Sequence, residues 1–278
     1  MRQDLAPDLD LAVAAARQAG AIAISHFGRA LDVTDKTPGQ PVTVADLEAD
    51  ALLRRLLLDG RPDYGWLSEE TADGPDRIGR RRVWIVDPID GTRSFIAGRP
   101  EFAVSVGLAE DGVVVAGVVF NPATDELYQG LLGCGAHLVA GGGAPRRLRV
   151  TDALPGAGRT VLASRTDIAA GDFAGLPPDW QIQPLGSTAY KMARVAAGGA
   201  DAFLSLGPKN EWDVCAGVLI VAEAGGRVTD LRGASPSFNR PSTLMHGILT
   251  SNGAVHDGML AAVSRDRGRA GPPRQTTG

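Results

Sequence analysis

The 278-residue sequence predicts a mixed fold, α+β in its first half and α/β in its second, on three observations. Apolar residues recur at helical spacing near the N-terminus, and runs of β-branched and aromatic residues separated by Asp-Gly turns follow from residue 83. In the second half, short apolar strands alternate with helical segments. A chain of this length can form one large domain or two modest domains that share a cleft.

The first half is expected to open with two helices, at residues 9–27 and 43–58, because both segments combine helical periodicity with strong helix formers. Three strands should follow and form a sheet, which we expect to be antiparallel because of the turns between them. Their ranges are residues 83–86, 102–108 and 113–120.

The Gly-rich stretch at residues 141–145 indicates a domain boundary near residue 145. It divides the chain into an α+β domain at residues 1–145 and an α/β domain at residues 146–263, with helices at 189–197 and 214–224. Residues 264–278 contain almost nothing apolar, so a disordered tail is predicted there.

Composition excludes several classes of function. The net charge is only −4 and no basic stripe is present, so a nucleic-acid polymer is not an expected partner. No apolar run approaches the length of a membrane span, and the first one, residues 11–24, is interrupted by Arg17 and Gln18, unlike a signal peptide. Cys134 and Cys215 lie far apart, and the four histidines are scattered, which argues against disulfides and zinc. A cytoplasmic protein is expected.

The strongest chemical signal is Asp87-Pro88-Ile89-Asp90-Gly91-Thr92, in which an apolar strand ends in two carboxylates. The two carboxylates can converge on one hard cation, and Mg²⁺ prefers such oxygen ligands. The amides of Gly91 and Thr92 can then face a phosphate. The same pattern is also an ordinary turn, so it needs partners elsewhere in the chain.

Three further acids are potential partners. Glu69, in Ser68-Glu69-Glu70, is either an inward carboxylate or half of a solvated charge pair. Asp213, at the start of an apolar helix, is a helix cap, a metal ligand or both. Asp46 is either a first-turn helix acid or a residue that orients a water molecule.

Taken together, these segments resemble the inositol monophosphatase superfamily of metal-dependent, lithium-sensitive phosphatases. The resemblance runs from the first helix to about residue 255 and includes several motifs in the right order. The motifs are Thr43-Val44-Ala45-Asp46, Ser68-Glu69-Glu70, residues 87–92, Gly186-Ser187, Trp212-Asp213 and Ala216-Gly217. The resemblance implies a layered α/β/α/β/α sandwich of the inositol monophosphatase and fructose-bisphosphatase type, and often a homodimer.

The resemblance also implies roles for individual residues. Glu69, Asp87 and the Ile89 carbonyl would bind one Mg²⁺, and Asp87, Asp90 and Asp213 would bind a second. A third, weaker ion would sit near Glu69. The catalytic side chains would be Asp46, Thr92 and Glu69, of which Asp46 and Thr92 help to activate the attacking water. The substrate would be a small phosphate ester, hydrolysed without a covalent intermediate.

The shared metal site does not decide between branches of the superfamily. Inositol monophosphatases usually carry a Glu seven residues before the aspartate of Trp-Asp, and this position is Leu206 here. Residues 206–213 and 186–192 instead resemble CysQ-type nucleotidases. We therefore expect Leu206 to pack on a purine, and Gly186 and Ser187 to contact the ribose or a phosphate. The predicted activity is hydrolysis of 3'-phosphoadenosine 5'-phosphate to AMP, as in 3'(2'),5'-bisphosphate nucleotidases.

Two alternatives remain open. One is an inositol-1-phosphate phosphatase or broad sugar phosphatase, with Glu211 supplying the polar contact that Leu206 lacks. The other is a non-catalytic scaffold of the same fold, which is disfavoured because burying so many carboxylates without metal is costly.

The only lysines in the chain are Lys36, Lys191 and Lys209, and all three lie beside predicted site segments. An ammonium group is suited to pairing with phosphate, so we hypothesise that Lys191 or Lys209 meets the second phosphate of the substrate. Chance placement is the alternative, since lysines are usually solvated. Residues 164–167 are a further possible contact that does not discriminate between branches.

Overall fold

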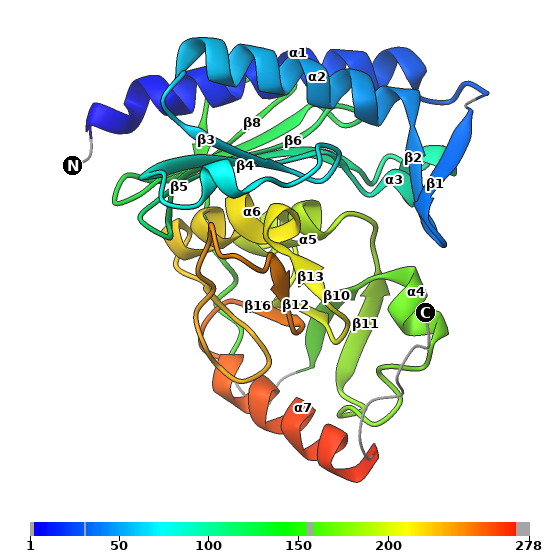
Figure 1. Cartoon of the computed structure of the whole chain (residues 1–278). Coiled ribbons are helices and arrows are strands. Elements are labelled where there is room, and N and C mark those ends of the chain that lie inside the picture. Colours follow the sequence, from blue (N-terminus) through cyan, green and yellow to red (C-terminus); the bar gives the residue numbers. More distant parts are fainter. Residues whose placement is uncertain (1–2, 31, 155–157, 271–278) are drawn as a thin grey trace.

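The computed structural model describes residues 3–30, 32–154 and 158–270 of the chain. These residues form five layers, in the order helix, sheet, helix, sheet, helix (Figure 1). The layered α/β/α/β/α sandwich predicted from the sequence is therefore confirmed.

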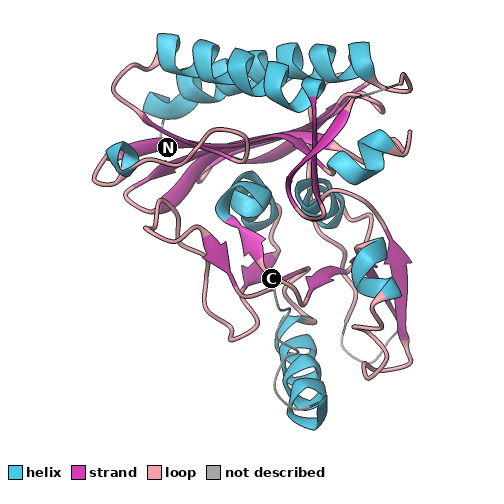
Figure 2. Ribbon diagram, turned by 45° about the vertical axis from the view of Figure 1, so that its right-hand side comes forward, coloured by secondary structure: helices cyan, strands magenta, loops and turns pink. Residues whose placement is uncertain are grey.

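The first layer consists of α1 (Ala6–His26) and α2 (Val44–Gly60), which lie side by side across one face of the larger sheet (Figures 1 and 2). Both predicted helices are present, with ends within three residues of those expected. Before α1 lies a short 3-10 turn, η1 (Gln3–Leu5), and between the two helices the chain makes a hairpin of β1 (Val33–Thr37) and β2 (Gln40–Thr43).

The larger sheet has seven strands, and every neighbouring pair is antiparallel except β3 and β4, which are parallel. In pairing order they are β3 (Gly65–Ser68), β4 (Arg82–Asp90), β5 (Ala103–Glu110), β6 (Val113–Asn121), β7 (Glu126–Leu131), β8 (Gly135–Ala140) and β9 (Arg146–Arg147). The 3-10 turn η2 (Pro75–Arg77) separates β3 from β4, and α3 (Thr92–Ile96) separates β4 from β5. The three predicted strands, β4, β5 and β6, pair antiparallel as expected, and the parallel neighbour β3 is a strand that the sequence did not predict.

Helices on both faces explain why the central strands are apolar throughout. Along β5, Val104, Val106 and Leu108 pack under α1 and α2, while Ala103 and Ala109 belong to the core on the opposite face. A strand buried on both sides has no polar face to alternate with.

The middle layer consists of α5 (Thr188–Ala196) and α6 (Glu211–Glu223), and α6 approaches the larger sheet unusually closely. A Cβ atom on Gly107 would lie 2.5 Å from the Cys215 sulfur, and one on Gly117 would lie 2.8 Å from the Ala216 carbonyl oxygen. Only glycine permits this contact. It brings the first turn of α6 against the sheet that carries β4.

The smaller sheet has five strands in the order β11-β10-β12-β16-β14. Their bounds are β11 (Trp180–Pro184), β10 (Arg159–Ala163), β12 (Ala202–Ser205), β16 (Ile248–Ser251) and β14 (Arg227–Thr229). A two-stranded ladder of β13 (Lys209–Asn210) and β15 (Leu244–Met245), and the short α4 (Arg165–Ala169), lie beside it. Because α5 and α6 belong to the second half of the chain but α6 packs on the first sheet, the domain boundary near residue 145 stays a prediction.

The last layer is α7 (His256–Ala270), whose residues Met259, Ala262 and Val263 are buried against the smaller sheet. The predicted disordered tail at residues 264–278 is therefore wrong for residues 264–270, which continue this helix. Arginine and alanine have high helix propensity, so a helix anchored by its first turns extends through them. Residues 271–278 lie outside the described residues.

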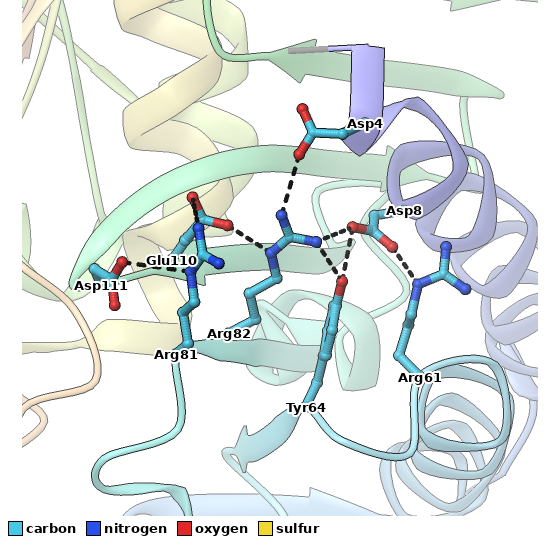
Figure 3. A network of polar contacts seen from close by, with 8 residues as sticks. All are labelled: Asp4, Asp8, Arg61, Tyr64, Arg81, Arg82, Glu110 and Asp111. Atoms are coloured by element: carbon cyan, nitrogen blue, oxygen red, sulfur yellow. Dashed lines mark hydrogen bonds and ion pairs between the residues drawn. The ribbon is translucent and has the colours of Figure 1, made fainter.

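The N-terminal end of α1 is joined to the sheet by a polar network around Asp8, which is 1% exposed (Figure 3). The Asp8 carboxylate accepts hydrogen bonds from Arg61, from the Tyr64 hydroxyl at 3.0 Å and from Arg82 at 3.3 Å. Arg82 also pairs with Glu110 of β5 at 2.6 Å. Within the described residues, no helix is long and apolar enough to cross a membrane.

Candidate active site

A cavity of about 740 Å³ opens where β4 ends and where α5 and α6 begin. Most of the side chains predicted for the site line it. These are Glu69, Asp87, Asp90, Gly91, Thr92, Gly186, Ser187, Lys191, Lys209 and Asp213.

Three carboxylates form the centre of the cavity. Glu69, just after β3, Asp87 of β4 and Asp213 of α6 each offer one oxygen atom, and these oxygens lie within 4.8 Å of one another. Glu69 is held in place because its amide donates to the Val86 carbonyl at 3.2 Å, which extends the pairing of β3 with β4. Glu69 and Asp213, which are 144 positions apart in the sequence, thus lie in one cluster.

This cluster is electrostatically strained in the absence of a cation. Burial, followed by the charges of Glu69, Asp90 and Asp213, raises the pKa of Asp87 well above its usual value. Burial also raises the pKa of Asp213 to about 7, although Lys209 opposes the shift. The buried Oδ1 atom of Asp87 has no hydrogen-bond partner among the described residues. An all-oxygen donor set with an unsatisfied buried atom fits a hard divalent cation such as Mg²⁺.

Asp90 lines the cavity but is not part of the compact group of three. Its Oδ2 atom accepts hydrogen bonds from the Ser187 hydroxyl and the Ala189 amide, at the start of α5. Burial raises the pKa of Asp90, while the Ser187 hydroxyl and the charge of Lys191 oppose this shift. The Oδ2 atom of Asp90 therefore anchors the start of α5. The prediction that Asp90 is a metal ligand then concerns its other oxygen, Oδ1, and it stays a prediction.

A bulge explains how Asp87 and Asp90 can face the same cavity. Residues three apart on a regular strand point to opposite faces of the sheet. Here the register between β4 and β5 shifts between Asp87 and Asp90. The extra residue reorients the chain, and Pro88, which lacks an amide proton, is tolerated at such a position.

Gly91 follows directly and adopts a left-handed conformation with φ of 98°. A Cβ atom there would lie 2.9 Å from the Glu101 carbonyl oxygen and 3.1 Å from the Ser187 amide nitrogen. Both the conformation and the space therefore require glycine. The turn ends at Thr92, whose hydroxyl lies 3.1 Å from the Ile89 carbonyl oxygen.

Asp46 and Asp213 occupy equivalent positions in two helix starts. Each is the third residue of its helix and part of a capping box. The Oδ2 atom of Asp46 accepts from the Thr43 amide at 2.8 Å, and that of Asp213 accepts from the Asn210 amide at 2.7 Å. The other oxygen is left for the site: Oδ1 of Asp46 lies 3.2 Å from the Thr92 hydroxyl. Capping and a place in the site are therefore compatible.

The rim of the cavity contains charge pairs that the sequence did not reveal. Lys36, on the β1–β2 hairpin, lies 2.7 Å from Glu69 and 2.9 Å from Glu70. Arg165 pairs with Glu101, which also accepts from the Gly186 amide at 2.8 Å. Glu101 had no recognisable motif around it, because its partners lie 64 and 85 residues away.

Two of the predicted substrate contacts, Leu206 and Glu211, do not line this cavity, so their role in substrate binding stays a prediction. Leu206 does not line the cavity; it packs with Leu204 in the core beneath α7. Side chains alternate along β12, so Phe203 faces the other core, and Leu206, directly after the strand, lies on the same side as Leu204. Glu211 is fully buried, and its carboxylate accepts from the amides of Asn239 and Arg240. It stabilises a loop and does not reach the cavity.

A family model described as the inositol monophosphatase family matches residues 4–268. The chain belongs to the inositol monophosphatase family. It is 35% identical over 269 residues to an inositol-1-monophosphatase of Mesorhizobium japonicum, covering 92% of this chain and 96% of that protein. The structure of an IMPase from Thermotoga maritima superposes with a TM-score of 0.80 at 32% identity, over 95% of this chain and 100% of that one.

Members of this family are metal-dependent phosphatases that act on phosphate monoesters, so this chain is a phosphatase. A CysQ from Bacteroides thetaiotaomicron also shares the fold, with a TM-score of 0.74 at 28% identity over 88% of this chain and 97% of that one. The relationship to CysQ is thus more distant, and the comparisons do not support the nucleotidase branch over the inositol-1-monophosphatases.

Proposed function

We propose that this chain is a Mg²⁺-dependent phosphomonoesterase for a small soluble substrate. The observation that carries the proposal is the group formed by Glu69, Asp87 and Asp213, in which a buried Asp87 oxygen has no hydrogen-bond partner among the described residues. These residues, together with Asp90 and the Ile89 carbonyl, would hold two or three Mg²⁺ ions. Such ions supply charge neutralisation of the phosphate and activation of water.

Asp46 and Thr92 are placed to manage the proton of the attacking water. Burial raises the pKa of Asp46, although hydrogen bonds from Thr43 and Thr92 oppose this shift. A raised pKa brings a carboxylate closer to the range useful for a general base. The Thr92 hydroxyl lines the cavity and contacts Asp46, so it can relay a proton from a water molecule to this carboxylate.

Two substrates deserve first consideration. Inositol 1-phosphate is favoured by the names of sequence relatives, such as the inositol-1-monophosphatase of Mesorhizobium japonicum. 3'-Phosphoadenosine 5'-phosphate, which is hydrolysed to AMP by bisphosphate nucleotidases, is favoured by the two lysines that line the cavity, Lys191 and Lys209. The argument from Leu206 no longer supports the nucleotide.

The test is phosphate release from both substrates, side by side, with millimolar Mg²⁺ and with EDTA. Asp87→Asn should reduce kcat by at least about 10³-fold, because it removes a charge from the centre of the metal site. Asp59→Asn, on an exposed position of α2, is the matched control and should retain activity. Mg²⁺-independent hydrolysis, or full activity of Asp87→Asn, would exclude the proposed chemistry.

The alternative of a non-catalytic scaffold makes a different prediction. A working metal site should raise the melting temperature when millimolar Mg²⁺ is added, because ligands that bind only the folded state stabilise it. A scaffold should show neither this shift nor phosphate release. We also propose that lithium inhibits the protein, that it forms a homodimer and that it is located in the cytoplasm. Sedimentation analysis tests the homodimer.

A further inference from the structure

Glu69 and Asp213, two acids of the carboxylate cluster, belong to chain segments that are also joined outside the cavity wall. Glu69 is followed by a loop at residues 70–77, which ends in the 3-10 turn η2, and Asp213 lies in the first turn of α6. A second loop, at residues 239–240, forms hydrogen bonds with both segments. The separation of the two acids therefore depends on this loop as well as on the packing of α6 against the larger sheet.

Arg77, the last residue of η2, joins the first segment to the loop at residues 239–240. Its side chain is 2% exposed, and its guanidinium group donates two hydrogen bonds of 2.7 Å to the Asp73 carboxylate. It also donates to the side-chain oxygen of Asn239 at 2.8 Å and to the Arg240 carbonyl at 3.0 Å. The side-chain amide of Asn239 donates in return to the Arg77 carbonyl at 3.1 Å. The rigid fork of a guanidinium group thus fixes two loops that lie 162 positions apart in the sequence.

Glu211, the first residue of α6, holds the same loop from the second segment. Its side chain is fully buried, and its carboxylate accepts hydrogen bonds from the Asn239 amide at 2.6 Å and from the Arg240 amide at 3.0 Å. The Arg240 guanidinium group also donates to it, at 3.3 Å. Because Glu211 lies two residues before Asp213, the loop also fixes the start of the helix that carries this acid.

These contacts form a buried network behind the cavity, since the cavity wall does not include Arg77, Asn239 or Glu211. Compared with apolar side chains of similar volume, a buried ionic network contributes little net stability. Each of its hydrogen bonds nevertheless tolerates only a narrow range of length and angle. The main consequence of the network is therefore a defined geometry for the segments that it joins.

We propose that Arg77 and Glu211 are positioning residues for the metal site. Through the loop at residues 239–240, they set the separation of Glu69 and Asp213, whose oxygens lie within 4.8 Å of each other. Mg²⁺ requires nearly ideal octahedral geometry, so its affinity depends on how closely such oxygens are held in place. This inference rests on the proposed Mg²⁺-dependent function and adds to it residues that act from outside the cavity.

The experiment measures Mg²⁺ binding without substrate, by calorimetric titration with the metal alone. Arg77→Met and Glu211→Gln should each weaken Mg²⁺ binding by about tenfold, an effect typical of removing a group that orients a metal ligand without touching the metal. Methionine keeps much of the volume of the arginine stem but none of its donors. Glutamine keeps the shape of Glu211, but its NH₂ group faces one of the two backbone amides, so one hydrogen bond is lost.

The double variant tests whether both residues act through the same loop. If they do, Arg77→Met combined with Glu211→Gln should weaken Mg²⁺ binding about as much as either change alone, whereas independent effects would multiply to about a hundredfold. Kinetics supply a second readout that loss of stability does not move. In both single variants the Mg²⁺ concentration for half-maximal activity should rise about tenfold, while KM for the phosphate ester at saturating Mg²⁺ should stay within about twofold of the wild-type value.

Arg82→Met is the matched control. Arg82 also has several buried partners, including Glu110 at 2.6 Å and the Tyr64 hydroxyl at 2.6 Å, but its network joins α1 to the larger sheet (Figure 3). This variant should lower the melting temperature as Arg77→Met does, and it should leave Mg²⁺ binding unchanged.

A positioning role is refuted if Arg77→Met and Glu211→Gln bind Mg²⁺ as tightly as the wild type, or if Arg82→Met weakens binding to the same extent. Glu211→Gln, the more conservative change, tests this role even if Arg77→Met folds poorly. If the wild type does not bind Mg²⁺, the proposed function and the positioning role both fail. If it binds Mg²⁺ but hydrolyses no phosphate ester, only the proposed function fails, and the calorimetric comparison still decides the positioning role.

Discussion

Asp213→Asn should stabilise the metal-free protein while abolishing its response to Mg²⁺. Burial holds the pKa of Asp213 at about 7, against 3.8 for an ordinary aspartate. The folded protein therefore binds this proton more tightly than the unfolded chain does. The resulting stability is present at low pH and is lost as the pH rises from about 4 to about 7.

The size of the effect follows from the shift. One pKa unit corresponds to about 1.4 kcal/mol, so ionising Asp213 at pH 8 costs the folded protein up to about 4 kcal/mol. Because the side chain is only partly shielded from solvent, we expect about 2–4 kcal/mol. Asparagine keeps an oxygen that can accept the hydrogen bond of the Asn210 amide, which is 2.7 Å long in the wild-type protein. The helix cap should therefore survive.

Urea unfolding in EDTA measures this gain. At pH 8, Asp213→Asn should unfold with a free energy about 2–4 kcal/mol above that of the wild type, and the difference should fall below about 2 kcal/mol at pH 5. Millimolar Mg²⁺ should stabilise only the wild type. A variant that is no more stable than the wild type in EDTA at pH 8 would show that burial does not hold the pKa of Asp213 near 7 in the folded protein.

Three further predictions concern the frame around the site. Burial lowers the pKa of His256 to about 4, so the folded protein resists protonation of this side chain. Lowering the pH from 7 to 5 should therefore reduce the free energy of unfolding of the wild type by about 2 kcal/mol more than that of His256→Gln. Urea unfolding of both proteins at both pH values measures this difference. Gly91→Ala should reduce kcat/KM at least about tenfold, because φ of Gly91 is 98° and the Glu101 carbonyl oxygen would lie 2.9 Å from the new Cβ atom. The control is Gly28→Ala, which should retain activity because Gly28, with φ of 75°, has open space around its Cβ position. Asp8→Ala should destabilise the fold by about 3 kcal/mol in a thermal melt without changing KM, because Arg82 loses a buried partner.

Helices and strands with a strong local period were predictable from the sequence. α1 and α2 follow from their helical spacing, and β4, β5 and β6 of the larger sheet follow from β-branched runs separated by turns, whereas the other strands of that sheet were not predicted. The end of α7 was not predictable in this way, because whether a polar segment stays helical depends on the packing of the turns before it.

Within the site, the sequence determined the local motif. The arrangement of Asp87, Asp90 and Gly91 depends on the backbone of a few adjacent residues, because a bulge and a left-handed turn are local features. The capping boxes of Asp46 and Asp213 are equally local, spanning three residues each.

Tertiary structure decided which of these groups meet, and which side chains face the cavity. Asp213 reaches Asp87 because Gly107 and Gly117 let α6 approach the sheet, a contact between residues about 100 positions apart. Leu206 was assigned to the cavity by its distance in sequence from Asp213, but it follows β12 on the side of Leu204 and packs in the core beneath α7. A one-residue change of register reverses the face of a strand residue, so spacing along the chain could not locate it.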